Sequence, residues 1–94
     1  TEDDFASAFR KMLTIEQFRS EEMQKLYQQY LVAGPASYVK ALFESIGIVN
    51  AKDKAARFYA VMHFYYSLYD GAADKEKVKV EFVSAIKSLV QDLA

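Results

Sequence analysis

Hydrophobic residues recur every three or four positions along most of the chain, a spacing that predicts amphipathic helices. The first segment runs from Asp3 to about Arg19, and its apolar side chains share one helical face: Phe5, Phe9, Met12 and Leu13. The second segment begins after Ser20, whose hydroxyl can cap a helix with two acidic residues in its first turn, and it runs to about Ala33. Its apolar face consists of Met23, Leu26, Tyr27, Tyr30 and Leu31.

The dipeptide Gly34-Pro35 can separate this helix from the next one, because glycine tolerates a left-handed cap and proline suits the first turn of a helix. A single kinked helix is the alternative. The one-sided pattern returns over a third segment, from about Pro35 to Ile46. Gly47 supplies its stop, and Ile48 and Val49 are placed to fold back on its end.

Two more helices complete the pattern. The fourth is capped at Asn50 or Asp53 and ends at Asp70-Gly71, whereas Asp74 caps a fifth that runs from Lys75 almost to the end. The apolar stripe of the fifth helix comprises Val78, Phe82, Ala85, Ile86, Leu89 and Leu93. No segment has the pattern of a strand, so the sequence predicts one all-α domain over residues 1–94, a bundle of five helices.

The fourth helix differs from the others because apolar residues occupy nearly all of its sides. Six of the fourteen aromatic residues lie between Phe58 and Tyr69, and no charged residue follows Arg57 until Asp70. A surface helix needs only one apolar stripe, so this helix has to be covered from more than one direction. With 52% hydrophobic residues in 94, the chain has more apolar side chains than it can bury alone, which predicts a partner chain.

One stripe of the fourth helix carries small residues, namely Ala56, Ala60 and Ser67. Small side chains let a second helix approach closely, so we expect this stripe and its neighbours His63 and Phe64 to form the seam of a homodimer. His63 is the only histidine and has two interpretations. It is either a ligand contact or pH-sensitive group at the interface, or an ordinary hydrogen-bonded histidine of the core or interface.

Composition and charge exclude several functions. Twelve basic and thirteen acidic residues leave a net charge of -1, so this part of the protein has no basic field that would draw it to nucleic acid. No cysteine is present, and no stretch is apolar enough to span a bilayer, which favours a cytoplasmic protein. We expect no metal, no cofactor and no catalytic residues, because the chain has one histidine, no phosphate-binding loop and no nucleophile motif.

Two stretches, LTIEQFRSEEMQKLYQQYLVAGPASYVKALFESI and FYAVMHFYYSLYDGAADKEK, are followed by the last amphipathic helix. Their order and spacing, over nearly the whole chain, resemble the C-terminal regulatory domain of TetR-family transcriptional repressors. The resemblance implies a homodimer in which the last two helices of each subunit form a four-helix interface, with a ligand pocket among the earlier helices. It also implies an N-terminal helix-turn-helix domain, absent from this chain, through which alone DNA would be bound.

The chain opens at Thr1 without an initiator methionine. We interpret this as a piece of a longer protein, a processed product or a partly ordered chain, and expect the helix-turn-helix pattern upstream.

A small-molecule site needs mostly apolar walls with a few polar groups, and the converging helices can supply both, although aromatic stripes at helical spacing belong more often to a core. The expected ligand-binding residues are Phe9, Met12, Glu16, Met23, Tyr27, Tyr30, Tyr38, Met62 and Tyr65. Glu16 projects onto the apolar side of the first helix, where it would orient a ligand with a cationic or hydrogen-bond-donating end. Alternatively, the helix frays or restarts near Glu16 and the carboxylate reaches water.

The expected dimer interface comprises Ala56, Ala60, His63, Phe64, Ser67, Phe82, Ile86 and Leu89. The predicted function is therefore an effector-binding and dimerisation domain of a TetR-like repressor that senses a small apolar or aromatic molecule. The alternative is a helical module that only dimerises or binds a protein partner. A solvent-shielded cavity of ligand size among the first four helices would favour the sensor, and its absence the interaction module.

Overall fold

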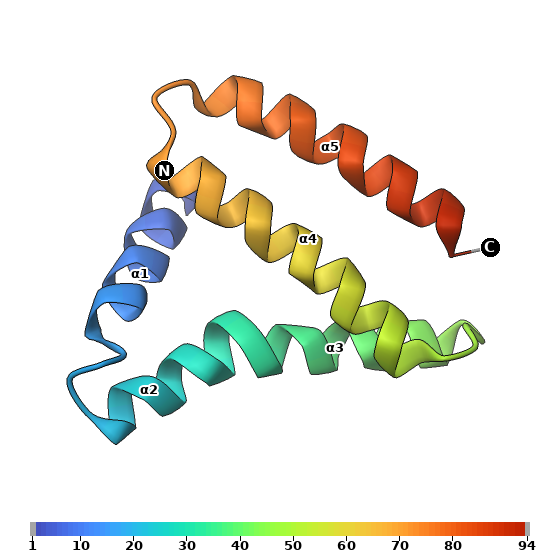
Figure 1. Cartoon of the computed structure of the whole chain (residues 1–94), viewed down its shortest axis with the longest axis horizontal. Helices are drawn as coiled ribbons and strands as arrows, with labels where there is room; N and C mark the ends of the chain where they lie inside the picture. Colours follow the sequence, from blue (N-terminus) through green and yellow to red (C-terminus); the bar gives the residue numbers. More distant parts are fainter. Residues whose placement is uncertain (1, 94) are drawn as a thin grey trace.

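The computed structural model describes residues 2–93, which form helices joined by short turns (Figure 1). The α-helices are α1 (Glu2–Glu16), α2 (Glu21–Tyr27), α3 (Ala33–Ser45), α4 (Ala51–Gly71) and α5 (Lys75–Asp92). A single π-helical turn, η1 (Gln28–Val32), lies between α2 and α3. No strand occurs in the described part of the chain, so the prediction of an all-α protein is confirmed.

Helix α2, the turn η1 and helix α3 follow one another without interruption. The dipeptide Gly34-Pro35 therefore lies inside one long helical segment, as in the kinked alternative, and residues 2–93 contain four such segments instead of five. Helix α1 ends at Glu16, earlier than predicted, because the chain tightens into a turn in which the Arg19 amide donates to the Glu16 carbonyl at 3.0 Å. Ser20, in an extended conformation, then starts the next helix.

Two predicted helix caps are confirmed. The Ser20 hydroxyl accepts a hydrogen bond from the Met23 amide at 3.1 Å, and the Asp74 carboxylate accepts one from the Lys77 amide at 3.1 Å. Asn50 also precedes its helix, but its side chain makes no cap and its backbone is left-handed, with a φ of 57°. Its contribution is the reversal of the chain before α4.

The predicted stop at Gly47 is confirmed as well. Gly47 has a φ of 81°, and the amide that follows it, on Ile48, donates to the Phe43 carbonyl at 3.0 Å. This is the Schellman arrangement, in which a left-handed residue lets the chain satisfy the last carbonyls of the helix. Ile48 then packs against the cluster formed by Phe43, Ala51 and Ala55.

Proline inside the helix explains both the π turn and one long-range hydrogen bond. In a regular α-helix the amide of residue 35 would bond to the Leu31 carbonyl, but Pro35 has no N–H, and its ring crowds that carbonyl. The wider π turn occurs directly before this point, where extra room is needed. The buried Tyr59 hydroxyl donates to the Leu31 carbonyl at 2.5 Å, replacing the missing donor and joining α4 to η1.

A double-mutant cycle tests this replacement. We expect Tyr59→Phe to cost about 1–3 kcal/mol of unfolding free energy, because it leaves a buried carbonyl without its donor. In a Pro35→Ala background the new amide can reach the carbonyl, so the same change should cost less than about 1 kcal/mol. Urea denaturation of the four proteins measures the difference. Equal costs in both backgrounds would show that the hydroxyl does not compensate for proline.

The helices form a thin layer rather than a globule, with extents of 39 × 33 × 19 Å. In Figure 1, α2 and α3 run along the base, α4 crosses diagonally, and α5 lies on the other side of α4. The radius of gyration is 14.5 Å, against about 12.4 Å for a compact domain of this length. The accessible surface is 6719 Å², about 1,200 Å² more than a monomer of 10.7 kDa normally exposes.

The buried apolar residues are correspondingly few: Leu13, Leu31, Phe43, Ala51, Ala55 and Tyr59. They lie where α1, η1 and α3 meet α4. Helix α5 buries none of its side chains completely, although Leu93, directly after it, packs against the Phe43 cluster. Much apolar surface is therefore left at the faces of α1, α4 and α5.

Candidate ligand-binding site

An open groove of about 660 Å³ lies between α1, η1, α3 and α4. Four residues of its wall were predicted as ligand contacts: Phe9, Tyr30, Tyr38 and Met62. The residues of the wall that were not predicted are Ala6, Arg10, Leu31, Pro35, Val39, Leu42, Phe43, Phe58, Tyr59 and Tyr66. Most of the wall is apolar, and its volume falls in the range of small-molecule sites.

The other five predicted contacts lie outside this wall. Tyr65 lines a second cavity, Met12 is exposed, and Met23 and Tyr27 are half-buried elsewhere. Glu16 ends α1 and forms an ion pair with Arg19 at 3.0 Å. The local-turn interpretation of Glu16 therefore describes its surroundings better than a role as pocket anchor.

Residues 2–93 do not close over the groove. Tyr38 at its rim is 67% exposed, and Tyr30 and Leu42 are about half exposed. The site therefore has the size expected of a ligand pocket without the shielding from solvent that the sequence led us to expect. A ligand, a second chain or a partner segment would have to provide the missing side.

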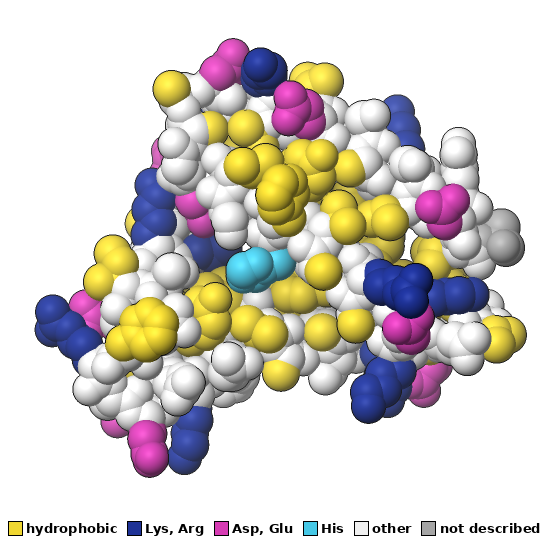
Figure 2. Space-filling model, viewed as in Figure 1, with side chains coloured by type: hydrophobic (Ala, Val, Ile, Leu, Met, Phe, Trp, Pro, Cys, Tyr) yellow, Lys and Arg dark blue, Asp and Glu magenta, His cyan; other side chains and the backbone are white. Residues whose placement is uncertain are grey.

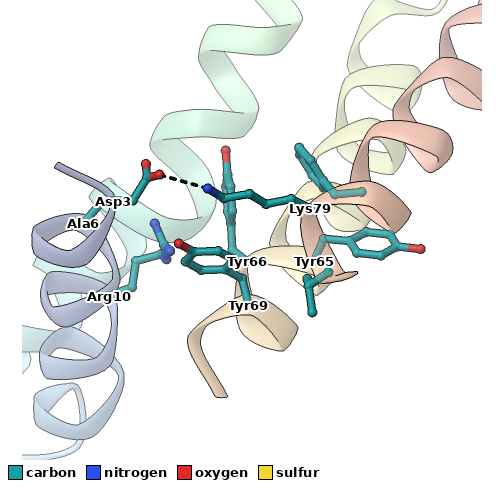
Figure 3. Close-up of a pocket in the computed structure, with 9 residues that line it drawn as sticks. Asp3, Ala6, Arg10, Tyr65, Tyr66, Tyr69 and Lys79 are labelled. Carbon is teal, nitrogen blue, oxygen red and sulfur yellow. Dashed lines mark hydrogen bonds and ion pairs between the residues drawn. The ribbon is translucent and has the colours of Figure 1, made fainter. Parts of the chain in front are cut away.

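A second cavity of about 230 Å³ lies between α1, α4 and α5. Figure 3 shows Arg10 extending from α1 toward Tyr66 and Tyr69 of α4, and Lys79 reaching from α5 to Asp3. Three residues, Ala6, Arg10 and Tyr66, belong to the walls of both cavities, and we call them the partition. The Arg10 guanidinium lies over the Tyr66 ring, 4.8 Å from its centre, a cation–π contact.

The partition is fixed by a polar cluster of Ser7, Arg10 and Asp70. Arg10 Nε and Nη2 donate to the two oxygens of the Asp70 carboxylate at 2.9 and 2.6 Å, and the Ser7 hydroxyl donates to the same carboxylate at 2.6 Å. This cluster ties α1 to the last turn of α4. A two-pronged arginine–carboxylate pair is both strong and directional, so the position of Arg10 is well defined.

The electrostatics of the cluster follow from burial and hydrogen bonding. Burial of the Asp70 carboxylate works to raise its pKa, but the hydrogen bonds from Arg10 and Ser7 outweigh burial, and the pKa is lowered. The hydrogen bond to Asp70 raises the pKa of Arg10 despite partial burial. Both groups are therefore charged at neutral pH. Burial raises the pKa of Tyr59 to about 12, so its hydroxyl remains a donor to Leu31.

Sequence reasoning missed this cluster, although one feature pointed toward it. Asp70 sits in the last turn of α4, where the helix dipole disfavours a negative charge. A carboxylate at that position calls for a cation from elsewhere in the fold. The identity of that cation, Arg10, depends on how α1 packs against the end of α4, which the helical pattern does not specify.

The residues predicted for the dimer seam fall into two groups. Those on α4 lie on an exposed face: Ala56, Ala60, Phe64 and Ser67. His63 beside them is half-buried, with its ring 6.0 Å from that of Tyr59. Figure 2 shows apolar side chains gathered over α4 and α5 on this face, with the single histidine in cyan among them.

On α5 the predicted residues are less available. Phe82 packs within the chain, 5.6 and 5.9 Å from the rings of Tyr65 and Tyr66, and Ile86 and Leu89 are half-buried. The exposed apolar residues of this helix are instead Val80, Val83 and Val90.

Within residues 2–93, no three histidine, aspartate or glutamate side chains are grouped in a way that could hold a metal ion. None of the helices described has the length and apolar character needed to cross a membrane. No protein-family model, curated protein or solved structure matches the chain.

Proposed function

We propose that this chain is the effector-binding and dimerisation domain of a TetR-like transcriptional repressor, and that its ligand is a small molecule with a largely apolar or aromatic body. The observation that carries the proposal is the groove between α1, η1, α3 and α4, whose wall is mostly apolar and whose volume suits a small molecule, although its rim lacks the expected shielding from solvent. The TetR family is proposed because the order and spacing of the helical segments resemble its regulatory domain. DNA would be bound only through a separate N-terminal domain.

Ligand binding in the groove should stabilise the folded protein. At a concentration one hundred times Kd, a compound would add about 2.7 kcal/mol and raise the Tm by about 10–20 °C. A thermal-shift screen of neutral hydrophobic and aromatic compounds measures this. Leu42→Arg at the rim should abolish the shift, whereas Val49→Arg, equally apolar before substitution but in the turn before α4, should leave it unchanged.

Dimerisation is supported by the surplus of exposed surface and by the apolar face of α4 and α5. An ordinary interface buries about 800 Å² on each partner, which is within the excess of about 1,200 Å² found here. We propose that the face containing Ala60 and Phe64 meets its copy in a second chain, with Val83 of α5 at its edge. A two-fold axis would place each of these residues at the interface twice.

Light scattering should give twice the chain mass of 10.7 kDa at micromolar concentration. Burying a phenylalanine contributes about 1.5–3 kcal/mol, so Phe64→Glu, which acts on both copies of the interface, should give the monomer mass. Phe18→Glu is the matched control, because Phe18 is also exposed but lies in the turn after α1. A monomer mass for the unmodified chain would refute the proposed interface.

The openness of the groove favours a second candidate, a helical interaction module. An apolar groove with an exposed rim also suits one face of an amphipathic helix from a protein partner. The two candidates differ in the thermal-shift screen. Failure of all compounds, with the protein still folded and dimeric, would favour the interaction module.

A further inference from the structure

The wall of the groove has a single charged side chain among the residues that the structure describes, that of Arg10. This side chain is 18% exposed and lies at the α1 end of the groove, in the partition with Ala6 and Tyr66. The remainder of the wall offers only apolar groups and tyrosine hydroxyls, one of which is committed to the Leu31 carbonyl. A ligand with an apolar body and one polar end would match this distribution.

The guanidinium is held on two sides and keeps donors for a third contact. Asp70 accepts from Nε and Nη2, and the guanidinium lies over the Tyr66 ring. An arginine side chain has five N–H donors. Within residues 2–93, the Arg10 side chain donates to no acceptor other than Asp70. An arginine held in this way loses little conformational entropy when it binds an acceptor.

We propose that the ligand of the groove is an amphipathic molecule with a carboxylate-like end, which binds the remaining donors of Arg10 while its apolar body lies against α3 and α4. This inference rests on the groove being the ligand site, as proposed above. Asp70 acts as a positioning residue that fixes the guanidinium. From the sequence, Glu16 suggested a ligand with a cationic end. Glu16 lies outside the wall, however, and the charged residue in the wall is Arg10, which favours an anionic end.

The expected difference in affinity between a carboxylate and a neutral ligand follows from the ion pair between Arg10 and Asp70. Asp70 offsets most of the arginine charge, so the ligand gains hydrogen bonds to a charged donor more than attraction to a net positive field. We therefore expect a carboxylate to bind roughly tenfold more tightly than a neutral alcohol with the same tail. A cationic amine with that tail should bind most weakly, because Arg10 offers it no acceptor.

Isothermal titration of the unmodified protein with octanoate, heptanol and heptylamine tests the order of affinity, since the three carry the same heptyl tail and differ only in the end group. A second readout needs no variant. The NMR resonance of the Arg10 side-chain N–H should shift on addition of octanoate and remain in place with heptanol.

Variants locate the carboxylate. The double variant Arg10→Gln/Asp70→Asn removes both charges together, so no unpaired charge remains, and it should bind octanoate and heptanol equally. Lys79→Gln is the matched control, because Lys79 is a cation in the wall of the second cavity but not in that of the groove. It should retain the tenfold preference.

Equal binding of octanoate and heptanol by the unmodified protein would overturn the carboxylate proposal while leaving the groove as a ligand site. Loss of the preference in Lys79→Gln would place the carboxylate beside Lys79 and outside the groove, which also overturns the proposal. If none of the three compounds binds, the carboxylate proposal is overturned, whereas the proposed function depends on the separate thermal-shift screen of neutral and aromatic compounds.

Discussion

Gly34→Ala is expected to destabilise the fold by more than about 2 kcal/mol, although the substitution would favour most helices. A Cβ at this position would lie 1.8 Å from the Gln29 carbonyl oxygen, which belongs to the backbone of the π turn and cannot rotate away. Relief would require the turn to rearrange, and the contact between Tyr59 and Leu31 depends on that turn. Urea denaturation gives the free energy directly.

Gly71→Ala is the matched control for this prediction. Gly71 also lies in a helix, but no atom within 4 Å would meet its Cβ. The change should therefore be neutral or stabilise by up to about 1 kcal/mol, through helix propensity alone. Similar stabilities for the two variants would mean that the π turn relaxes without cost.

Asp70→Ala should cost roughly 2–3 kcal/mol, because it leaves the half-buried Arg10 charge and the buried Ser7 hydroxyl without their acceptor. This is below the cost for a fully buried pair, since both side chains keep some contact with water. Asp53→Ala is the control. Its ion pair with Arg57 is exposed on α4, so the loss should be about 0.5 kcal/mol or less.

The same pair predicts how stability depends on pH. The pKa of Asp70 is lowered in the folded protein, so its contribution is complete above the unfolded pKa of about 3.9 and is lost as the pH falls through the folded pKa. Between about pH 6 and pH 3, the unmodified protein should lose more stability than Asp70→Asn. Parallel loss in both proteins would show that another carboxylate governs acid unfolding.

Structural features that depend only on neighbouring residues could be predicted from the sequence. The caps at Ser20 and Asp74 and the stop at Gly47 depend on neighbours within about one turn, and all three are confirmed. The dipeptide Gly34-Pro35 left two alternatives, because its local chemistry fits both a break and a kink. The kinked helix is stabilised by a distant group, because the Tyr59 hydroxyl donates to the Leu31 carbonyl that proline leaves without a donor.

The candidate site was less predictable, for a physical reason. Helical periodicity identifies which residues share a face, so Phe9, Tyr30, Tyr38 and Met62 were expected in the wall. It does not identify which ends of two helices meet. The pairing of Arg10 with Asp70 spans sixty positions and depends on that meeting, so the charge of the groove could not be obtained from the pattern.

Helix α5 has no completely buried residue, so it should be the first helix to unfold locally. Local unfolding requires least free energy where few apolar contacts are broken, so the amides of α5 should exchange with solvent before those where α3 packs on α4. If a second chain covers the face of α5, the protection of the α5 amides from exchange depends on the protein concentration. The stability of the last helix is then a property of the assembly, whereas that of the α3–α4 contact belongs to the single chain.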